Sequence, residues 1–136
     1  MRHTGAVMGW KIAVAAGLAL GLTCAGPGYA VAPNHFSGKA AYYDKDYHDI
    51  VTAGGKYDPK KFTCAHLTLP LGTRVLITDV KTKRTVECLV NDRGPHSKKL
   101  IIDLSWAAAL KLDMIKRGII DVTVDVLPAT AADAKQ

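Results

Sequence analysis

The residues that could carry chemistry gather in three segments of the chain. A polar loop at 42–58 holds several aspartates and His48, the run TCAH occupies 63–66, and the run NDRGP occupies 91–95. Asp103 follows the third segment. Carboxyl and imidazole groups are the usual proton donors and acceptors of enzymes. The three segments are therefore candidates for a site that moves protons.

Asp92 is the carboxyl group whose position is most informative. It comes directly after a predicted strand and opens the turn Arg93-Gly94-Pro95. An aspartate at such a place can accept hydrogen bonds from backbone N–H groups and hold the turn. It can also present its carboxyl group to a substrate as an acid. The spacing alone leaves both roles open.

Short β-strands are the elements that must position these residues. Alternation of apolar and polar residues predicts strands at 73–79 and 85–90, joined as a hairpin by the polar turn 80–83. The run 119–127 alternates more cleanly and predicts a half-buried strand. The nearly continuous apolar run 100–104 predicts a strand buried on both sides.

The pattern contains one short helix. Ser105 can cap a helix over 106–112, a segment rich in Ala and Leu. Pro128 ends the last predicted strand, and the polar residues after it are typical of a frayed tail. Many short strands, one short helix and several Gly or Pro turns favour a small closed β-barrel.

Length and charge limit the class of protein. The chain has 136 residues, of which 49% are hydrophobic, so it is one domain's worth of sequence with enough apolar residues for a packed core. Its net charge is +6, but the basic residues are scattered, whereas a nucleic-acid binder would gather them into a stripe with aromatic platforms. We therefore expect no nucleic-acid partner and favour an anionic extracellular polymer. No spacing of His, Asp or Glu predicts a metal site.

Residues 1–30 are typical of a secretory signal peptide. A basic leader precedes the uncharged apolar run 12–23, and small residues follow that run. Cleavage is expected after Ala30, with Ala32 as the second possibility. The rest of the chain would then be periplasmic or extracellular, without stable membrane insertion.

Two alternatives to cleavage stay open. The leader could remain as an N-terminal anchor, since the uncharged stretch is long enough to cross a bilayer. Lipid attachment at Cys24 is the other, and it is disfavoured because the three residues before Cys24 depart from the usual lipobox.

Cys64 and Cys88 are the two cysteines that follow the leader. An even pair in an oxidising compartment predicts a disulfide between them. Closing that loop would contribute roughly 3 kcal/mol in the chain-entropy model. The alternative is two free, buried thiols.

Three motifs give the chain a resemblance to a known family. AHLTLPLGT occupies 65–73, VNDRGP occupies 90–95, and IDLSWAAA occupies 102–109. Together they resemble the rare lipoprotein A (RlpA) family. The resemblance implies a mainly β fold, a single six-stranded double-psi β-barrel with one or two short helices, over residues 38–127. Residues 31–37 are then interpreted as a linker and 128–136 as a flexible tail.

The resemblance also implies an activity. Family members are lytic transglycosylases that cleave the glycan strands of peptidoglycan and prefer strands without stem peptides. A general acid protonates the glycosidic oxygen, and the C6 hydroxyl of N-acetylmuramic acid attacks its own C1, which leaves a 1,6-anhydro end. The resemblance implies that the domain acts on peptidoglycan as a monomer and without a cofactor.

The family pattern predicts His66 and Asp92 as the catalytic residues, because they match its Ala-His and Asn-Asp-Arg-Gly-Pro motifs. The Glu of the family loop is missing, since Gly55 or Lys56 stands in its place. The acid would then be Asp92 or an aspartate of the loop. A catalytically inactive, expansin-like barrel that binds glycan is the alternative. Five residues are predicted to bind substrate: Tyr43, Thr52, Lys56, Asp58 and Asp103.

Overall fold

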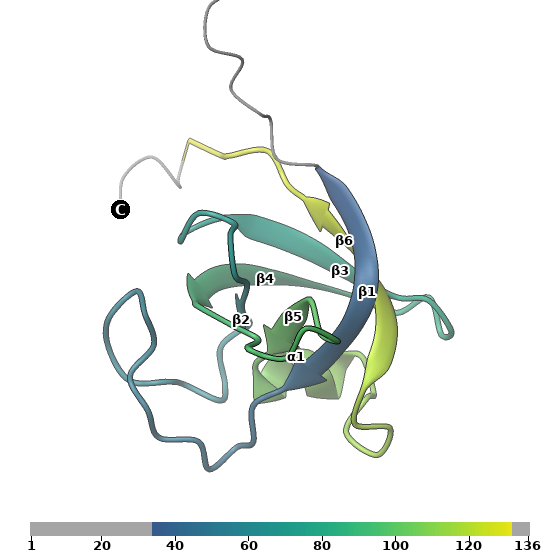
Figure 1. Ribbon diagram of the computed structural model, residues 1–136, viewed down its shortest axis with the longest axis horizontal. Coiled ribbons are helices and arrows are strands. Elements are labelled where there is room, and N and C mark those ends of the chain that lie inside the picture. The colour runs from purple at the N-terminus through teal and green to yellow at the C-terminus, as the bar shows by residue number, and fades with distance from the viewer. Residues whose placement is uncertain (1–33, 132–136) are drawn as a thin grey trace, which may run out of the picture. The chain divides into compact units, whose positions relative to one another are not determined.

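The computed structural model describes residues 34–131, which form a closed six-stranded β-barrel. The strands are β1 (His35–Tyr42), β2 (Thr63–Ala65), β3 (Arg74–Asp79), β4 (Thr85–Asp92), β5 (Ile102–Leu104) and β6 (Ile120–Val126), and the helix α1 (Trp106–Lys111) lies between β5 and β6. They close in the order β1-β5-β2-β4-β3-β6 (Figure 1). The predicted signal peptide, Cys24 and the end of the predicted tail lie outside the described residues.

The order of the strands brings distant parts of the sequence together. β3 and β4 form the antiparallel hairpin that the sequence predicts. β2 is placed between β4, to which it is parallel, and β5, to which it is antiparallel. β1 is parallel to β5 and antiparallel to β6, and this pairing closes the barrel.

The barrel interior is filled by the apolar residues of the alternating strands. Val75 and Ile77 of β3 and Val122 and Val124 of β6 are fully buried, as the alternation predicts. Such interdigitated Val and Ile side chains stabilise the fold because burying each one removes apolar surface from water. Leu112 and the other buried residues after β5 join this core.

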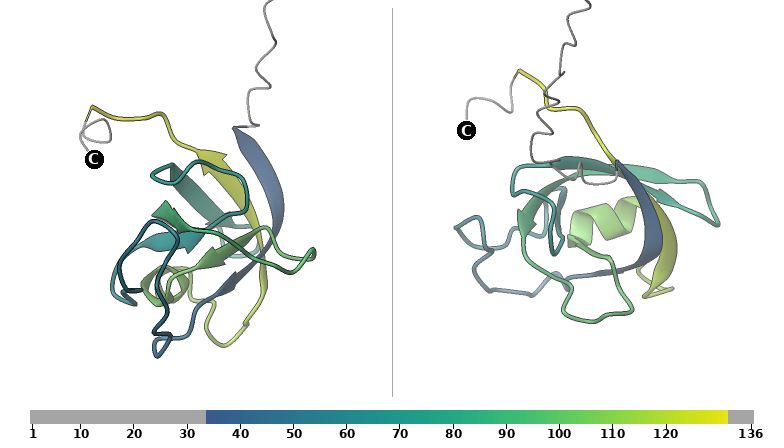
Figure 2. Two further views of the ribbon diagram at one scale, coloured as in Figure 1. Left: turned by 60° about the vertical axis from the view of Figure 1, so that its left-hand side comes forward. Right: turned by 45° about the horizontal axis from the view of Figure 1, so that its top comes forward.

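The helix α1 lies across one end of the barrel (Figure 2). The side chain of Ser105 caps it by accepting a hydrogen bond from the backbone N–H of Ala108 at 3.3 Å, as predicted. Ala108 and Ala109 are fully buried, and their small side chains allow the helix to approach the strands closely. Within residues 34–131 no helix is long and apolar enough to span a membrane.

The strand β1 corrects the sequence prediction, which assigned residues 31–37 to a linker. β1 begins at His35 and pairs with β6 from His35 opposite Asp125 to Ala40 opposite Ile120. Gly38 lies where a Cβ atom would come within 2.6 Å of Ile101, so the close approach of Ile101 to β1 requires glycine. Glycine gives a weak strand signal, which is why the pattern missed this element.

The structure holds Cys64 and Cys88 as free thiols, in place of the predicted disulfide. They lie on the neighbouring strands β2 and β4 and are 1% and 2% exposed. Burial raises the pKa of the Cys64 thiol, and the neighbouring Cys88 raises it further. The pair therefore behaves as two small core side chains, which is the alternative that the sequence left open.

We expect neither cysteine to react with iodoacetamide in the folded protein, because the core excludes the reagent from both thiols. At Cys64 a raised pKa also suppresses the reactive thiolate. Unfolding in denaturant without reductant should expose both thiols. Mass spectrometry should then detect one alkyl group on each cysteine. An unfolded chain that stays unmodified until reductant is added would instead contain the disulfide.

Candidate active site

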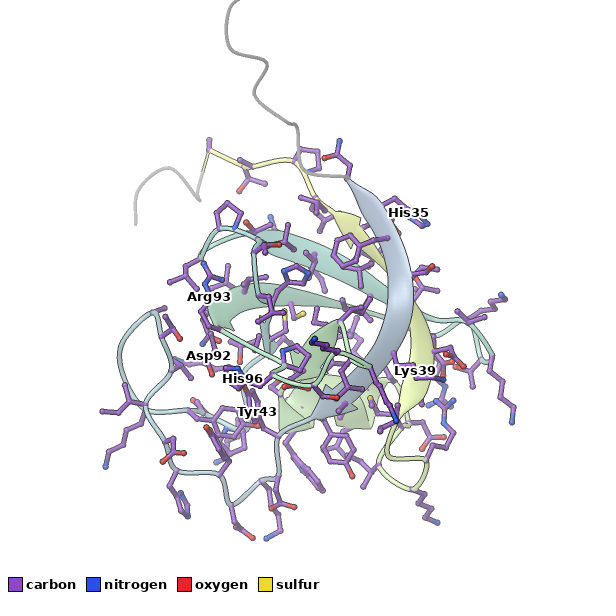
Figure 3. All side chains as sticks on the ribbon, in the orientation of Figure 1. His35, Lys39, Tyr43, Asp92, Arg93 and His96 are labelled. Atoms are coloured by element: carbon purple, nitrogen blue, oxygen red, sulfur yellow. The ribbon has the colours of Figure 1, made fainter. Side chains whose placement is uncertain are left out.

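A cleft of about 360 Å³ opens where β4 ends and the loop that follows it begins. It is lined by side chains from the loop after β1, from the end of β4, from the loop after β4 and from β5. These residues are Tyr43, Tyr47, Ile50, Thr52, Asp92, Arg93, Gly94, His96 and Asp103. Figure 3 shows Tyr43, Asp92 and His96 beside one another at this place. The cleft therefore collects residues from the first and third segments of the sequence.

The two aspartates of the cleft are placed by a shared neighbour in the sheet. Ala65 of β2 pairs with Asp92 of β4 on one side and with Asp103 of β5 on the other. The pairing of Ala65 with Asp92 follows a register shift between Cys64 and Ala65. The side chains of Asp92 and Asp103 both line the cleft.

Gly94 completes this part of the cleft. Its φ of +143° lies in the region that favours glycine. A Cβ atom at Gly94 would lie 3.7 Å from Asp103 Oδ2, 3.8 Å from the Cβ atom of Ala65 and 3.9 Å from the Tyr43 hydroxyl. The turn after Asp92 therefore passes closely over Ala65 and beside both Asp103 and Tyr43.

Asp92 is held by four hydrogen bonds. Its Oδ1 accepts from the backbone N–H of Thr52 at 2.8 Å, from the Thr52 hydroxyl at 2.6 Å and from the backbone N–H of Arg93 at 2.8 Å. Its Oδ2 accepts from the Tyr43 hydroxyl at 3.1 Å. Burial alone would raise the pKa of Asp92, but these bonds outweigh it and hold the pKa below its usual value of 3.8. Asp92, only 7% exposed, is therefore a stably ionised carboxylate.

The pKa of Asp103 is shifted in the opposite direction. Burial raises its pKa, and the negative charge of Asp92 raises it further, whereas His96 opposes the shift. No hydrogen bond from residues 34–131 reaches its carboxyl group. Two carboxyl groups with pKa values pushed apart are typical of an acid and an ionised partner. Asp103 is therefore a candidate for the proton donor beside Asp92, the residue that the sequence predicts.

His66 lies outside the residues that line the cleft. Its Nδ1 accepts hydrogen bonds from the backbone N–H groups of Thr68 at 3.1 Å and Leu69 at 3.0 Å, and its ring packs on Phe36 with centroids 5.2 Å apart. Burial and the charge of Arg93 lower its pKa, which favours the neutral imidazole that can accept these bonds. The contacts make His66 a residue that holds the turn before β3.

Three of the five predicted substrate-binding residues reach the cleft, namely Tyr43, Thr52 and Asp103. Lys56 and Asp58 do not line it. Lys56 instead pairs with Ile50 across a small turn, and Asp58 accepts a hydrogen bond from the backbone N–H of Lys60 at 2.9 Å. Both are therefore residues that shape the loop.

The loop between β1 and β2 is held against the barrel by polar and aromatic contacts. The backbone N–H of Ala53 donates to the Asn91 carbonyl at 2.9 Å, and that of Trp106 donates to the Tyr57 hydroxyl at 2.8 Å. The rings of Tyr43 and Tyr47 stack with centroids 4.7 Å apart, and each lies 5.5 Å from the ring of Tyr57. These contacts fix Thr52 where it can bind Asp92.

Thr52→Val should reduce the free energy of unfolding by about 1–2 kcal/mol, because it removes a hydroxyl that donates to a charged carboxylate. The same hydroxyl accepts from the backbone N–H of Arg93 at 3.1 Å. Thr52→Ser keeps the hydroxyl and is the matched control, with an expected change below about 0.5 kcal/mol. Urea unfolding measures the free energy of unfolding of both variants. An unchanged free energy of unfolding in Thr52→Val would show that the hydrogen bonds of the hydroxyl contribute nothing measurable.

Sequence analysis missed His96 and Ile50 as residues of the cleft. His96 follows directly after the NDRGP motif, so its position along the chain was the available signal. Ile50 is 74% exposed in a polar loop and carried no signal. Within residues 34–131 no group of three His, Cys, Asp or Glu side chains could hold a metal ion.

The chain is similar to a known protein family and to several of its members. A family model described as "Lytic transglycolase" matches residues 35–124. The endolytic peptidoglycan transglycosylase RlpA of Haemophilus influenzae is 44% identical over 91 residues, which cover 66% of this chain and 32% of that protein. The protein of the same name from Vibrio cholerae is 40% identical over 92 residues, which cover 67% of this chain and 35% of that protein. The chain thus spans about a third of the length of these relatives.

Solved structures share the barrel. The Streptomyces papain inhibitor matches with a TM-score of 0.57 and 25% identity over 69% of this chain and 94% of that one. The expansin of Clavibacter michiganensis matches with a TM-score of 0.56 and 20% identity over 71% of this chain and 52% of that one. The six strands form the double-psi β-barrel that the sequence predicts, and the chain belongs to the lytic transglycolase family.

Proposed function

We propose that this protein is an exported lytic transglycosylase that cleaves the glycan strands of peptidoglycan and leaves 1,6-anhydro-muramic ends. The observation that carries the proposal is the pair Asp92 and Asp103, two carboxyl groups that share one cleft and have pKa values shifted in opposite directions. Relatives named endolytic peptidoglycan transglycosylase support the substrate class.

Asp103 is the general acid of the proposed reaction. Its proton passes to the glycosidic oxygen as the bond from that oxygen to C1 of N-acetylmuramic acid breaks. The C6 hydroxyl of the same sugar forms the new bond to C1, and the proton of that hydroxyl returns to the Asp103 carboxylate. No water is consumed, and the enzyme ends in its starting protonation state.

Asp92 acts as the fixed negative charge. The transition state resembles an oxocarbenium ion, which a nearby anion stabilises. Because the hydrogen bonds to Asp92 already exist before the substrate arrives, the site need not reorganise as charge develops. The nucleophile belongs to the substrate, so the reaction requires no second carboxylate to activate water.

This arrangement provides a proton donor although the Glu of the family loop is missing. In this chain the loop contributes Thr52, which holds Asp92, and the cleft still contains an acid in Asp103. The stacked rings of Tyr43 and Tyr47 add an aromatic surface on which a sugar ring can pack. An active enzyme therefore agrees better with the cleft than the inactive, expansin-like barrel.

Export, the preference for strands without stem peptides and the monomeric state belong to the same proposal. The leader at 1–30 supports export to the periplasm or beyond. The resemblance to the RlpA family supports the substrate preference.

The test is to incubate the protein with purified glycan strands, with and without stem peptides, and to analyse the products by mass spectrometry. We expect anhydro-muramic ends, formed faster from strands without peptides. Strands that are bound but stay intact would instead identify the inactive glycan-binding barrel.

A further inference from the structure

Tyr47 and Ile50 give the cleft an apolar part, and both belong to the loop between β1 and β2. We propose that Ile50, together with the Tyr47 ring, binds the methyl group of the acetamido substituent on the amino sugars of the glycan, so that the cleft selects N-acetylated strands. The inference rests on the proposed function and adds to it a recognised chemical group. We call Tyr47 and Ile50 the apolar wall.

The Ile50 side chain is exposed to solvent inside the cleft. It is 74% exposed, although isoleucine is among the residues that are most often buried. Of the large exposed apolar side chains within residues 34–131, Ile50 is the one that lines this cleft. Its packing in the barrel does not account for an apolar residue at this position. A ligand methyl group that covers it would remove apolar surface of both partners from water, which favours binding.

The Tyr47 ring is held in place by its neighbours. It stacks on the Tyr43 ring with centroids 4.7 Å apart and lies 5.5 Å from the ring of Tyr57, which is only 7% exposed. The backbone N–H of Tyr47 donates to the Asp44 carbonyl at 3.1 Å. The ring is therefore in position before a ligand arrives, and less conformational entropy is lost on binding.

The backbone around Ile50 is fixed as well. Ile50 forms an antiparallel bridge with Lys56, and the backbone N–H of Val51 donates to the Gly55 carbonyl at 3.1 Å. The Val51 side chain is only 4% exposed and anchors the loop. Thr52 follows and is hydrogen-bonded to the end of β4. The loop thus presents Ile50 to the cleft from a fixed main chain.

The acetamido group is the substituent that can meet this wall while the sugar is at the two aspartates. It is attached to C2, which is bonded to the C1 atom at which the proposed reaction breaks the glycosidic bond. Asp92 and Asp103 line the same cleft of about 360 Å³ as Tyr47 and Ile50. A sugar whose C1 lies at the carboxyl groups therefore carries its acetamido methyl within the cleft, where Ile50 supplies an apolar contact.

Charge alone would lead to a different selection. Asp92 is ionised, so electrostatic attraction favours a strand whose C2 amino groups are free and positively charged. Removing the whole acetyl group therefore changes charge as well as shape. A formyl group in place of the acetyl group keeps the neutral amide and lacks only the methyl group. Formylated strands are thus the probe that isolates the contact with Ile50.

Binding to reacylated strands tests the inference. Glycan strands are deacetylated once and then reacylated with either acetyl or formyl groups, so that the two preparations differ by one methyl group per sugar. Binding is measured with the Asp103→Asn variant, so that cleavage does not interfere. We expect the formylated strands to bind about threefold to fourfold more weakly, which is the effect of one buried methyl group. Equal binding of the two preparations would overturn the inference.

Ile50→Ala removes the proposed contact, and Ile119→Ala is the matched control. Ile119 is 55% exposed and does not line the cleft. Ile50→Ala should weaken binding of the acetylated strands about threefold to fivefold and bind the two preparations equally. Ile50→Leu keeps an apolar side chain and should keep most of the preference, and Ile119→Ala should keep all of it. A preference for acetylated strands that survives Ile50→Ala would overturn the assignment of Ile50.

The outcome also separates this inference from the proposed function. A preference for acetylated strands in binding, without cleavage of any strand by the wild-type protein, would overturn the enzyme proposal and keep the role of the apolar wall. Cleavage by the wild-type protein, together with equal binding of the two preparations, would leave the transglycosylase proposal standing and overturn the inference.

Discussion

Asp103→Asn should reduce the rate of glycan cleavage by about 10²–10⁴-fold, which is the usual effect of removing a general acid. The amide has nearly the same shape as the carboxylic acid but donates no acidic proton to the glycosidic oxygen. Asp103 receives no hydrogen bond from the described residues, so its replacement should leave the fold intact. Release of anhydro-muramic ends measures the rate, and binding of intact strands by the variant shows that the cleft is still formed.

Asp58→Asn is the matched control, because Asp58 belongs to the neighbouring loop but does not line the cleft. It should retain most of the wild-type rate. The pH profile adds a second measurement. Because burial and Asp92 raise the pKa of Asp103, activity should fall on the alkaline side of a pKa above the ordinary value of 3.8. Full activity of the Asp103→Asn variant would show that the general acid is Asp92 or an aspartate of the loop.

Asp92→Ala should cause the largest loss of stability among changes in the cleft, about 3 kcal/mol in the free energy of unfolding. The substitution leaves two backbone N–H groups and two hydroxyl groups without their acceptor, and each such loss costs about 1–3 kcal/mol where water cannot replace it. Water can reach the exposed Thr52, which keeps the total below the sum of four bonds. Urea unfolding at neutral pH measures this loss.

The pH dependence of stability identifies the charge of Asp92. Its pKa is lowered in the folded protein, so its contribution to stability is fully present above the unfolded value of about 3.8 and is lost as the pH falls through the lower folded value. The stability difference between the wild type and Asp92→Asn should therefore be constant near neutral pH and become smaller below pH 4. Asp121→Asn, which changes an exposed ion pair, should have little effect at any pH. If the stability difference between the wild type and Asp92→Asn stays the same at low pH, the variant loses stability through packing and not through the charge of Asp92.

The parts of the fold that sequence analysis predicted are those whose residues alternate strongly. The β3–β4 hairpin, β6 and the helix capped by Ser105 all follow from Val and Ile periodicity or from a local cap. The pattern missed β1 because Gly38 and Ala40 face inward, and small residues give little periodic signal. Its position depends on pairing with β6, more than eighty residues later.

The sequence predicted several residues of the cleft, whereas their roles stay predictions that the activity of variants would test. Asp92, Tyr43, Thr52 and Asp103 were all named from the sequence, and all four line the cleft. Their roles depend on burial and on which groups meet across the barrel, and neither follows from local pattern. His66 shows the same limit, since its motif is local but its ring is engaged by the turn that the motif itself forms.

The position of Ala65 between the strands of the two aspartates has a consequence for the proposed reaction. Neighbouring strands in a sheet are held about 4.8 Å apart by their backbone hydrogen bonds. Asp92 and Asp103 each pair with Ala65 from a neighbouring strand, so the backbone of the barrel limits how far apart their Cα atoms lie. In the proposed reaction, this backbone spacing limits how far the proton donor can lie from the fixed negative charge.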